Sequence, residues 1–213
     1  MTRLLALDCS NYNLSVALLD QQQLLQYHQT VKQGHSDLAL TVIADLLQQA
    51  GLQLAELDAI LFGKGPGAFT GLRIAAGVAC GLATAANLPL HGIPTLDAIA
   101  LHLPAETGIA VLDARMSEVY ACRYLDGKAV GGTGVYQPAQ LSLQDGDVLA
   151  GDAASYFTDQ PHTFIACEPR AEHYIQLFQR QPQRYPASAT AELLYVRDKV
   201  ALTTAEQRNQ QRG

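Results

Sequence analysis

The loop GKGPGAFTGLR, residues 63–73, holds the strongest candidates for binding chemistry in the sequence. Glycines let a phosphate group come close to the backbone, and the N–H groups that open a following helix can bind its negative charge. Gly65 and Gly67 are therefore candidate phosphate-binding residues. The loop is not a Walker loop, since no Gly-Lys-Ser/Thr follows, and Ala68 replaces the third glycine of G-x-G-x-x-G. The simpler alternative is a strand-to-helix turn in which Thr70 caps the helix.

The histidines and cysteines lack the spacings that metal sites and catalytic nucleophiles require. No two of the six histidines lie three, four or five residues apart, which excludes H-E-x-x-H and related helical sites. The four cysteines form no C-x-x-C and no zinc spacing, and no serine lies in G-x-S-x-G. Cys80 lies among small apolar residues, where packing is its simplest role. The sequence therefore predicts no metal site and no catalytic residue.

Two apolar runs that end in aspartate divide the chain into similar halves. The run LLALD ends at Asp8, and the next predicted strand ends twelve residues later at Asp20. The run IAVLD ends at Asp113, and the next predicted strand ends thirteen residues later at Asp126. The offset between the halves is 113 − 8 = 105 residues, about half the chain. A repeat of this size indicates an internal duplication.

Duplicated halves that open with an Asp-ended hairpin are typical of the actin-like (ASKHA) fold, which sugar kinases and chaperone ATPases share. The sequence thus predicts an α/β protein of two lobes, with the second lobe reduced. In that fold the turns after the two aspartates face nucleotide phosphates, where a carboxylate holds the metal and backbone N–H groups approach the phosphate. Asp8 and Ser10 therefore join Gly65 and Gly67 as candidates for a weak, vestigial phosphate region.

The predicted elements place the boundary between the lobes after residue 102. Residues 1–102 form the first lobe, residues 103–200 the second, and residues 201–213 a polar tail. The first lobe is expected to hold a five-stranded sheet, with strands at residues 3–8, 14–19, 24–31, 58–63 and 90–93 and helices at residues 37–50, 70–86 and 95–102. Ser36 is the expected cap of the first helix, and Gly51 ends it. The second lobe is expected to hold strands at residues 109–113, 118–125, 128–136 and 147–150, with a helix after Gly151.

The two longer predicted helices, residues 37–50 and 70–86, are apolar on more than one side. One side can pack on the sheet, while the other is either buried within the chain or part of a subunit interface, and the residues alone leave both open. Gly77 and Gly81 are four apart, so they share a face and allow another backbone to come close. The candidate interface residues are Leu38, Val42, Leu46, Arg73, Gly77, Cys80 and Gly81.

The charge and the first residues bear on partners and compartment. The formal net charge is -6 with 14 basic residues, whereas nucleic-acid affinity depends on Lys and Arg neutralising phosphates. We therefore expect any RNA to be bound only indirectly, with another chain holding most of it. The opening MTRLLALDCS soon turns polar, unlike a signal peptide, and the most apolar run, residues 74–86, is too short to span a bilayer. We expect a cytoplasmic protein with free thiols and no membrane contact.

Four segments together resemble the TsaB (YeaZ) family. These are residues 5–18, the gapless stretch DAILFGKGPGAFTGLRIAAGVACGLA, the phrase VLDARMSEVYACRY and the closing LLYVRDKVAL. The resemblance implies an actin-like fold and a paralogue of TsaD, the enzyme that threonylcarbamoylates the adenosine beside the anticodon of certain tRNAs. It implies a non-catalytic scaffold subunit that binds a TsaD-like enzyme and supports assembly with a TsaE-like ATPase. Alone, such a subunit is expected to form a homodimer through the same helices.

The chain departs from the TsaD pattern at three places. The resemblance puts Thr95 and Ile99 where TsaD has its two metal-binding histidines, and neither side chain replaces imidazole as a strong ligand. Ser10 stands where kinases of this fold have a phosphate-turn glycine, and Asp152 replaces a glycine near the nucleotide base. These changes predict no tightly bound cofactor and at most weak ATP or ADP binding, at this degenerate site or at a subunit interface. The alternative is an enzyme in its own right, a small-molecule kinase or a glycoprotease-type peptidase.

Overall fold

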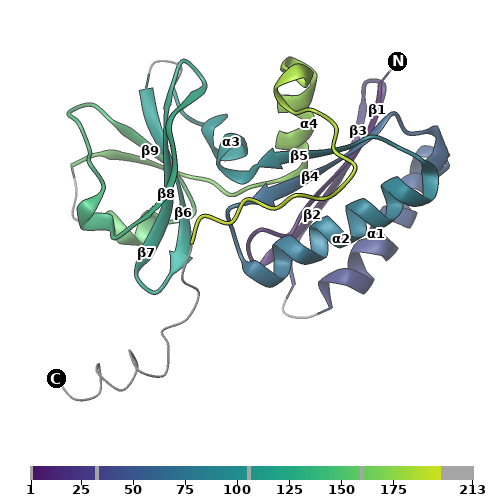
Figure 1. The fold of residues 1–213 in the computed structure, drawn as a ribbon, viewed down its shortest axis with the longest axis horizontal. Coiled ribbons are helices and arrows are strands. Elements are labelled where there is room, and N and C mark those ends of the chain that lie inside the picture. Colours follow the sequence, from purple (N-terminus) through teal and green to yellow (C-terminus); the bar gives the residue numbers. More distant parts are fainter. Residues whose placement is uncertain (1, 32–33, 105–106, 159–160, 198–213) are drawn as a thin grey trace.

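The computed structural model describes residues 2–31, 34–104, 107–158 and 161–197 (Figure 1). Within these ranges the chain forms two five-stranded sheets, with helices packed on and between them. Figure 1 shows the two sheets as separate lobes, joined through the region of β5, α3 and β6.

The first sheet contains an antiparallel hairpin extended by parallel strands. Its strands are β1 (Arg3–Asp8), β2 (Asn13–Asp20), β3 (Gln23–Thr30), β4 (Ala59–Gly65) and β5 (Leu90–Pro94). Their order is β3-β2-β1-β4-β5, with β1–β2 and β2–β3 antiparallel and β1–β4 and β4–β5 parallel. The predicted five-stranded sheet is therefore confirmed.

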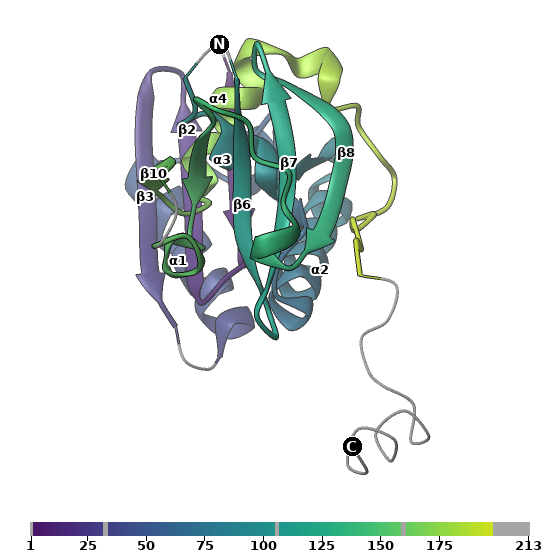
Figure 2. The ribbon, with the colours of Figure 1, turned by 90° about the vertical axis from the view of Figure 1, so that its left-hand side faces the viewer.

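The second sheet repeats this topology. Its strands are β6 (Thr107–Arg115), β7 (Glu118–Leu125), β8 (Lys128–Tyr136), β9 (Val148–Gly151) and β10 (Thr163–Ala166). Their order is β10-β9-β6-β7-β8, and each pair has the same relative direction as its counterpart in the first sheet (Figure 2). This confirms the duplication predicted from Asp8 and Asp113. The prediction of a helix after Gly151 was wrong, because the described residues there form only a short 3-10 turn, Ala154–Tyr156, and strand β10, which follows, was not predicted.

Both faces of the first sheet are covered by helices. Helices α1 (His35–Ala50) and α2 (Phe69–Ala86) lie side by side on one face, and α4 (Ala171–Arg180) lies on the other (Figure 1). Side chains alternate along a strand, so Leu5 and Leu7 pack towards α1 and α2 while Leu4 and Ala6 pack towards α4. Burial on both faces explains why β1 is almost continuously apolar. Helix α3 (Thr95–Ala100) lies between the sheets and contacts β5 and β6.

The helix starts differ from those predicted. Helix α1 begins at His35 after Gly34, whose φ is 82°, and no side chain caps it, so Ser36 is not the cap. Helix α2 begins at Phe69, and its N-cap Ala68 also has no side-chain bond, so Thr70 is not a cap either. The predicted end of α1 at Gly51 is confirmed, with the left-handed φ of 66° that glycine adopts readily.

The division of the chain into lobes also needs correction. The sequence assigned residues 103–200 to the second lobe, but α4 packs on β1, β2 and β4 of the first sheet. Residues 188–194 also return to the first lobe, where the Ser188 N–H bonds the Leu90 carbonyl at 2.9 Å. The first lobe therefore contains segments from both ends of the chain. The predicted tail, residues 201–213, lies outside the described residues.

Candidate functional site

A cleft of about 670 Å³ lies between the two lobes. Its walls are the turn after β1, the glycine-rich loop before α2, the turn after β6 and a C-terminal segment, residues 188–197, which we call the strap. The strap crosses from β5 of the first lobe to the end of β6 (yellow in Figure 1). Of the predicted phosphate-region residues, Ser10 and Gly67 line the cleft, whereas Asp8 and Gly65 lie behind its wall. Further lining residues are Asn13, His28, Tyr120, Asp152 and Glu168.

Both oxygens of the Asp8 carboxylate accept hydrogen bonds from within the chain. It is completely buried and accepts bonds from the Ser10 N–H at 3.0 Å, the Ser10 hydroxyl at 2.8 Å and the Tyr174 hydroxyl at 2.5 Å. Burial raises the pKa of Asp8 above its usual value, while the bond from Tyr174 acts against that shift. Burial also raises the pKa of Tyr174 well above its usual value. Asp8 therefore stabilises the interior of the first lobe through hydrogen bonds and does not face the cleft as a metal ligand would.

The glycines of the loop approach the chain's own backbone. A Cβ on Gly71 would lie 1.8 Å from the Cys9 carbonyl oxygen, and one on Gly67 would lie 2.5 Å from the Ser10 carbonyl oxygen. The Ala68 N–H, just before α2, donates to that Ser10 oxygen at 2.6 Å. Both glycines are thus needed for the close contact between loop and β1 turn. In this chain the space beside the glycines, which would let a phosphate come close, is therefore filled by the backbone of the β1 turn.

The turn after β6 has an ion pair in place of a buried carboxylate. Asp113 accepts bonds from the Arg115 N–H at 2.7 Å and from its guanidinium at 2.8 Å. The guanidinium of Arg115 also lies 4.2 Å from the ring centre of Tyr12, across the cleft on the β1 turn. Three successive non-glycine residues, Arg115, Met116 and Ser117, have left-handed φ values of 64°, 56° and 60°. Sequence reasoning missed Arg115 and Tyr12, because nothing in their spacing shows that the two turns meet.

Two further carboxylates, Asp152 and Glu168, line the cleft. Asp152 accepts a bond from the Asp113 N–H at 2.8 Å, and desolvation by the cleft walls raises the pKa of Asp152 to about 6, although solvent reaches its side chain. Glu168 is held at 2.6 Å by both the Asn13 amide and the His28 ring. Negative groups at this position disfavour a polyphosphate ligand.

The strap forms the remaining wall and joins the lobes. The Leu194 N–H donates to the Lys64 carbonyl at 2.7 Å, which fixes the strap to the first lobe. Arg197 reaches the second lobe, where its guanidinium bonds Glu118 at 2.5 Å and the Ala114 carbonyl at 3.1 Å. The family-like closing segment thus closes one side of the cleft.

The positions aligned with the TsaD histidines lie inside the protein. Thr95 and Ile99 are fully buried on α3. Between them, Asp97 accepts bonds from the hydroxyls of Tyr124 at 2.6 Å and Tyr185 at 3.0 Å. No group of three or more His, Cys, Asp or Glu side chains that could hold a metal occurs among the described residues. Burial also raises the pKa of the Cys9 thiol far above its usual value, which disfavours the nucleophilic thiolate.

The predicted interface residues divide into two groups. Val42 and Leu46 lie on the side of α1 that packs in the core, so the prediction that these two residues are exposed for a partner is corrected; Leu38 is partly buried. The helical spacing of these residues was correctly recognised, but their side of α1 packs on the sheet. Arg73, Gly77 and Gly81 are exposed on α2, and Cys80 is half-buried.

Known proteins resemble this chain in sequence and in structure. The tRNA threonylcarbamoyladenosine biosynthesis proteins TsaB of Haemophilus influenzae and Escherichia coli are 44% identical over 122 residues and 36% identical over 126 residues. These alignments cover 55% and 57% of this chain and 51% and 54% of the relatives, so the chain spans about half the length of the curated relatives it matches. The structure of YeaZ from Pseudomonas aeruginosa superposes with a TM-score of 0.81 and 34% identity, covering 92% of this chain and all of the other.

The repeated sheets and the cleft between them define a two-lobed, actin-like α/β protein. The family model of TsaD, tRNA N6-adenosine threonylcarbamoyltransferase, matches residues 26–162, more than half of the chain. The chain belongs to the TsaD family, within the branch of TsaB, also called YeaZ.

Proposed function

We propose that this chain is a non-catalytic partner subunit in the threonylcarbamoylation of the adenosine beside the anticodon of tRNA. It binds a TsaD-like catalytic paralogue through α1 and α2 and supports assembly with a TsaE-like ATPase. Alone it forms a homodimer through the same surface, and it contacts tRNA only indirectly. It acts in the cytoplasm and holds no cofactor tightly, with weak ATP or ADP binding confined to the degenerate cleft or to the subunit interface.

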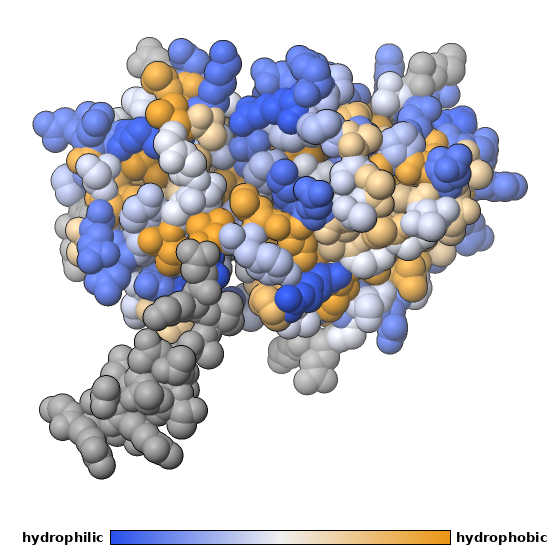
Figure 3. Space-filling model, viewed as in Figure 1, coloured by the Kyte–Doolittle hydropathy of each residue, from blue (hydrophilic) through white to orange (hydrophobic). Residues whose placement is uncertain are grey.

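The observation that carries this proposal is the exposed apolar surface of α2. Helix α2 has the length and hydropathy of a membrane-spanning helix, yet only 28% of it is buried. One side, with Leu72, Ala75 and Ala79, packs in the core of the first lobe, which identifies it as a helix of a folded domain. The other side presents a pale to orange surface in Figure 3, with few hydrophilic residues over the helix. Such a surface usually marks an interaction site.

The glycines on this exposed side support close packing by a partner helix. A Cβ built on Gly77 or Gly81 meets nothing within 4 Å, so neither glycine is required by packing inside the chain. A glycine inside a helix costs about 1 kcal/mol relative to alanine. Two of them on one open face are explained if another backbone comes close there. Because paralogues share a fold, the same face can serve both a second copy and the TsaD-like enzyme.

The state of the cleft supports the non-catalytic part of the proposal. The two carboxylate oxygens of Asp8 accept hydrogen bonds from Ser10 and Tyr174. Gly67 and Gly71 contact the β1 turn. A phosphate would have to displace these contacts and lie near Asp152 and Glu168. These features fit a cleft that has kept its architecture without the groups that position a nucleotide and metal.

The second candidate is an enzyme acting by itself. One similar crystal structure is described as a protein with similarity to peptidase YEAZ, which favours a test for peptidase activity. A peptidase needs a metal-bound water or an activated nucleophile, and a kinase needs an open phosphate turn. Incubating the purified chain with ATP, Mg²⁺ or Zn²⁺ and a peptide panel separates these functions. Turnover by the chain alone would refute the non-catalytic proposal.

Gly77→Leu tests the interface directly. A Cβ at position 77 meets nothing within 4 Å and leucine favours the helix more than glycine does, so thermal stability should be kept or slightly raised, while the added bulk should overpack the contact by roughly 1–3 kcal/mol. Since 1.4 kcal/mol is a factor of ten, affinity for the catalytic paralogue of the same organism should fall about tenfold to a hundredfold by calorimetry. Modified adenosine in tRNA of a depleted strain should fall with it. Gln179→Leu, at an exposed position on α4, is the matched control. Normal pairing by folded Gly77→Leu would place the interface elsewhere.

A further inference from the structure

Three exposed side chains form a compact cluster at the start of α2. The guanidinium of Arg73 lies 3.3 Å from the ring centre of Phe69 and 5.5 Å from that of Tyr195, which comes from the strap. The two rings are 5.8 Å apart and tilted by 45°. Phe69 is 46% exposed and Tyr195 is 49% exposed, so the cluster adds little to the core. We call Phe69, Arg73 and Tyr195 the Arg73 patch.

The Arg73 patch is held in place from two directions. Phe69 and Arg73 are one helical turn apart on α2, and the strap carries Tyr195 between two fixed points. On one side of Tyr195, the Leu194 N–H bonds the Lys64 carbonyl; on the other, Arg197 bonds Glu118. Two fixed aromatic rings and an arginine lose little side-chain freedom on binding, which favours affinity.

Most other arginines among the described residues are paired with a carboxylate, whereas Arg73 is not. Arg3, Arg123 and Arg184 form ion pairs with Asp20, Asp147 and Asp97, and Arg115, Arg170 and Arg197 are also paired. No carboxylate among the described residues lies within ion-pair distance of Arg73. Its face rests on the rings, so the N–H groups along its edge are free to donate a two-pronged bond to a planar anion.

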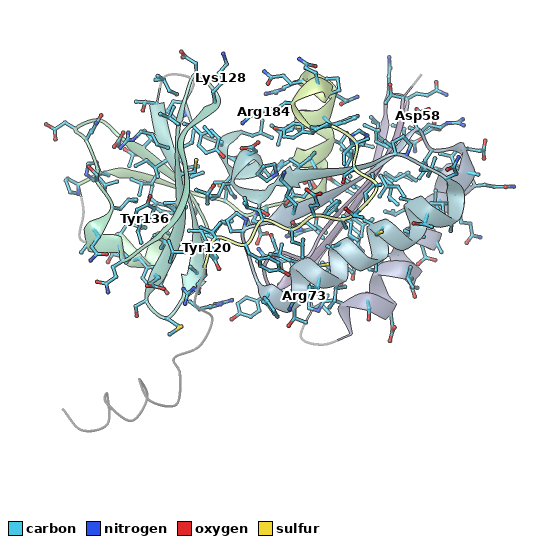
Figure 4. All side chains as sticks on the ribbon, in the orientation of Figure 1. Asp58, Arg73, Tyr120, Lys128, Tyr136 and Arg184 are labelled. Carbon is cyan, nitrogen blue, oxygen red and sulfur yellow. The ribbon has the colours of Figure 1, made fainter. Side chains whose placement is uncertain are left out.

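The Arg73 patch continues the surface assigned above to a protein partner. Phe69, Arg73, Gly77 and Gly81 follow one another at intervals of four, so they lie along one exposed face of α2. Figure 4 shows Arg73 at the end of α2 nearest the second lobe. A partner that covers the glycines therefore meets the patch next. Tyr and Arg are the residues most often found at the energetic centres of protein interfaces.

We propose that the Arg73 patch binds an acidic side chain, Asp or Glu, of the protein that covers α2. This inference rests on the proposed function for the existence of that partner. Phe69 and Tyr195 contact the aliphatic part of the acidic side chain, and Arg73 pairs with its carboxylate. A nucleic-acid phosphate is the less suitable ligand, because the chain carries a net charge of -6 and Asp113 and Asp152 line the neighbouring cleft.

The test measures affinity between this chain and the TsaD-like paralogue of the same organism by calorimetry at low and high salt. Arg73→Gln should weaken binding about tenfold at low salt and reduce the dependence on salt. Arg73→Lys keeps the charge but loses the stacked, two-pronged geometry, so it should recover only part of the affinity. Tyr195→Ala should weaken binding without changing the salt dependence. Arg180→Gln, which removes an exposed arginine on α4, should behave as the unchanged chain.

The outcomes separate this inference from the proposed function. If Gly77→Leu abolishes pairing while Arg73→Gln and Tyr195→Ala bind normally, the Arg73 patch proposal is overturned and the partner face on α2 stands. If none of the three variants changes affinity, both the Arg73 patch proposal and the proposed partner face on α2 are refuted. A fluorescent anticodon stem-loop RNA is the second probe. RNA binding by the chain alone that Arg73→Gln abolishes would make the patch a phosphate site and overturn the carboxylate proposal.

Discussion

The turns after β1 and β6 occupy equivalent places in the two repeats but are stabilised in different ways. Asp8 ends β1 completely buried, and its carboxylate bonds Ser10 and Tyr174. Asp113 lies at the end of β6 partly open to the cleft, and it bonds Arg115 of its own turn. The first turn is therefore held by a buried bond from a distant helix, and the second by Arg115 of its own turn together with Asp152 and Tyr156 at the rim of the cleft. One duplicated hairpin has become part of the core, whereas the other has remained a surface element of the cleft.

Removing the two aspartates should produce the largest contrast between the turns. Asp8→Ala leaves the Tyr174 hydroxyl buried without its partner and opens a small cavity, so the free energy of unfolding should fall by roughly 4 kcal/mol. Asp113→Ala removes a partly exposed pair with Arg115 and a bond from the Tyr156 hydroxyl, and it should cost only about 1 kcal/mol. Urea denaturation of both variants measures the difference. Equal losses would mean that the two turns are energetically equivalent after all.

Acid should destabilise α4, the helix whose Tyr174 holds the first turn. His173 precedes Tyr174 on α4 and is only 9% exposed; burial lowers the pKa of His173 to about 4, helped by His102 and Arg170 and opposed by Glu172. The unfolded chain takes up this proton near pH 6.5, whereas the folded chain resists it until about pH 4. Stability should therefore fall as pH drops from 6.5 towards 4, by roughly 3 kcal/mol for this group.

The control for this pH dependence is His173→Gln, which cannot take up the proton. Its unfolding free energy should vary less between pH 6.5 and 4 than that of the unchanged chain. If the two pH profiles run parallel, His173 does not carry the effect, and the acid sensitivity of the first turn has another source.

The smallest expected effect is at the second turn. Ser117 is exposed and has a φ of 60°, a region that costs a non-glycine residue about 1–2 kcal/mol. Ser117→Gly relieves that strain but adds freedom to the unfolded chain, so a net gain of about 0.5 kcal/mol is expected in thermal melting. Gln21→Gly at the tip of the β2–β3 hairpin, where φ is 57°, gives a comparison within the first lobe. A loss of stability in Ser117→Gly would show that contacts of the serine side chain stabilise this left-handed conformation.

Much of the fold could be predicted because its signals are local. The apolar runs ending at Asp8 and Asp113 revealed both hairpins and the duplication, and Gly51 marked the end of α1. Helix α4 was not among the predicted helices, and its position could not have been predicted either, since an amphipathic helix shows which side is buried but not which sheet buries it. The same limit placed Val42 and Leu46 on an interface when they are core residues.

The contacts of the site could not be predicted from the sequence. The glycines at positions 65 and 67 were predicted to be phosphate-binding residues, and in the structure the groups close to them are the chain's own backbone at Leu194 and Ser10. No spacing in a sequence distinguishes a glycine that admits a ligand from one that admits a neighbouring loop. Tyr174 and the strap were missed for a related reason, because their partners lie between 79 and 166 residues away along the chain.

The bond between Tyr174 and Asp8 spans 166 residues and bears on how the protein folds as it is made. During synthesis β1 leaves the ribosome long before α4, the helix that covers its second face. Until then Leu4 and Ala6 have no helix to cover them, and Asp8 lacks its hydroxyl partner. Contacts this distant in sequence form slowly, and exposed apolar strands are prone to aggregate while they wait. The first lobe can thus be completed only after every strand of the second sheet has been synthesised, and a ribosome that stops before α4 releases a sheet with one bare face.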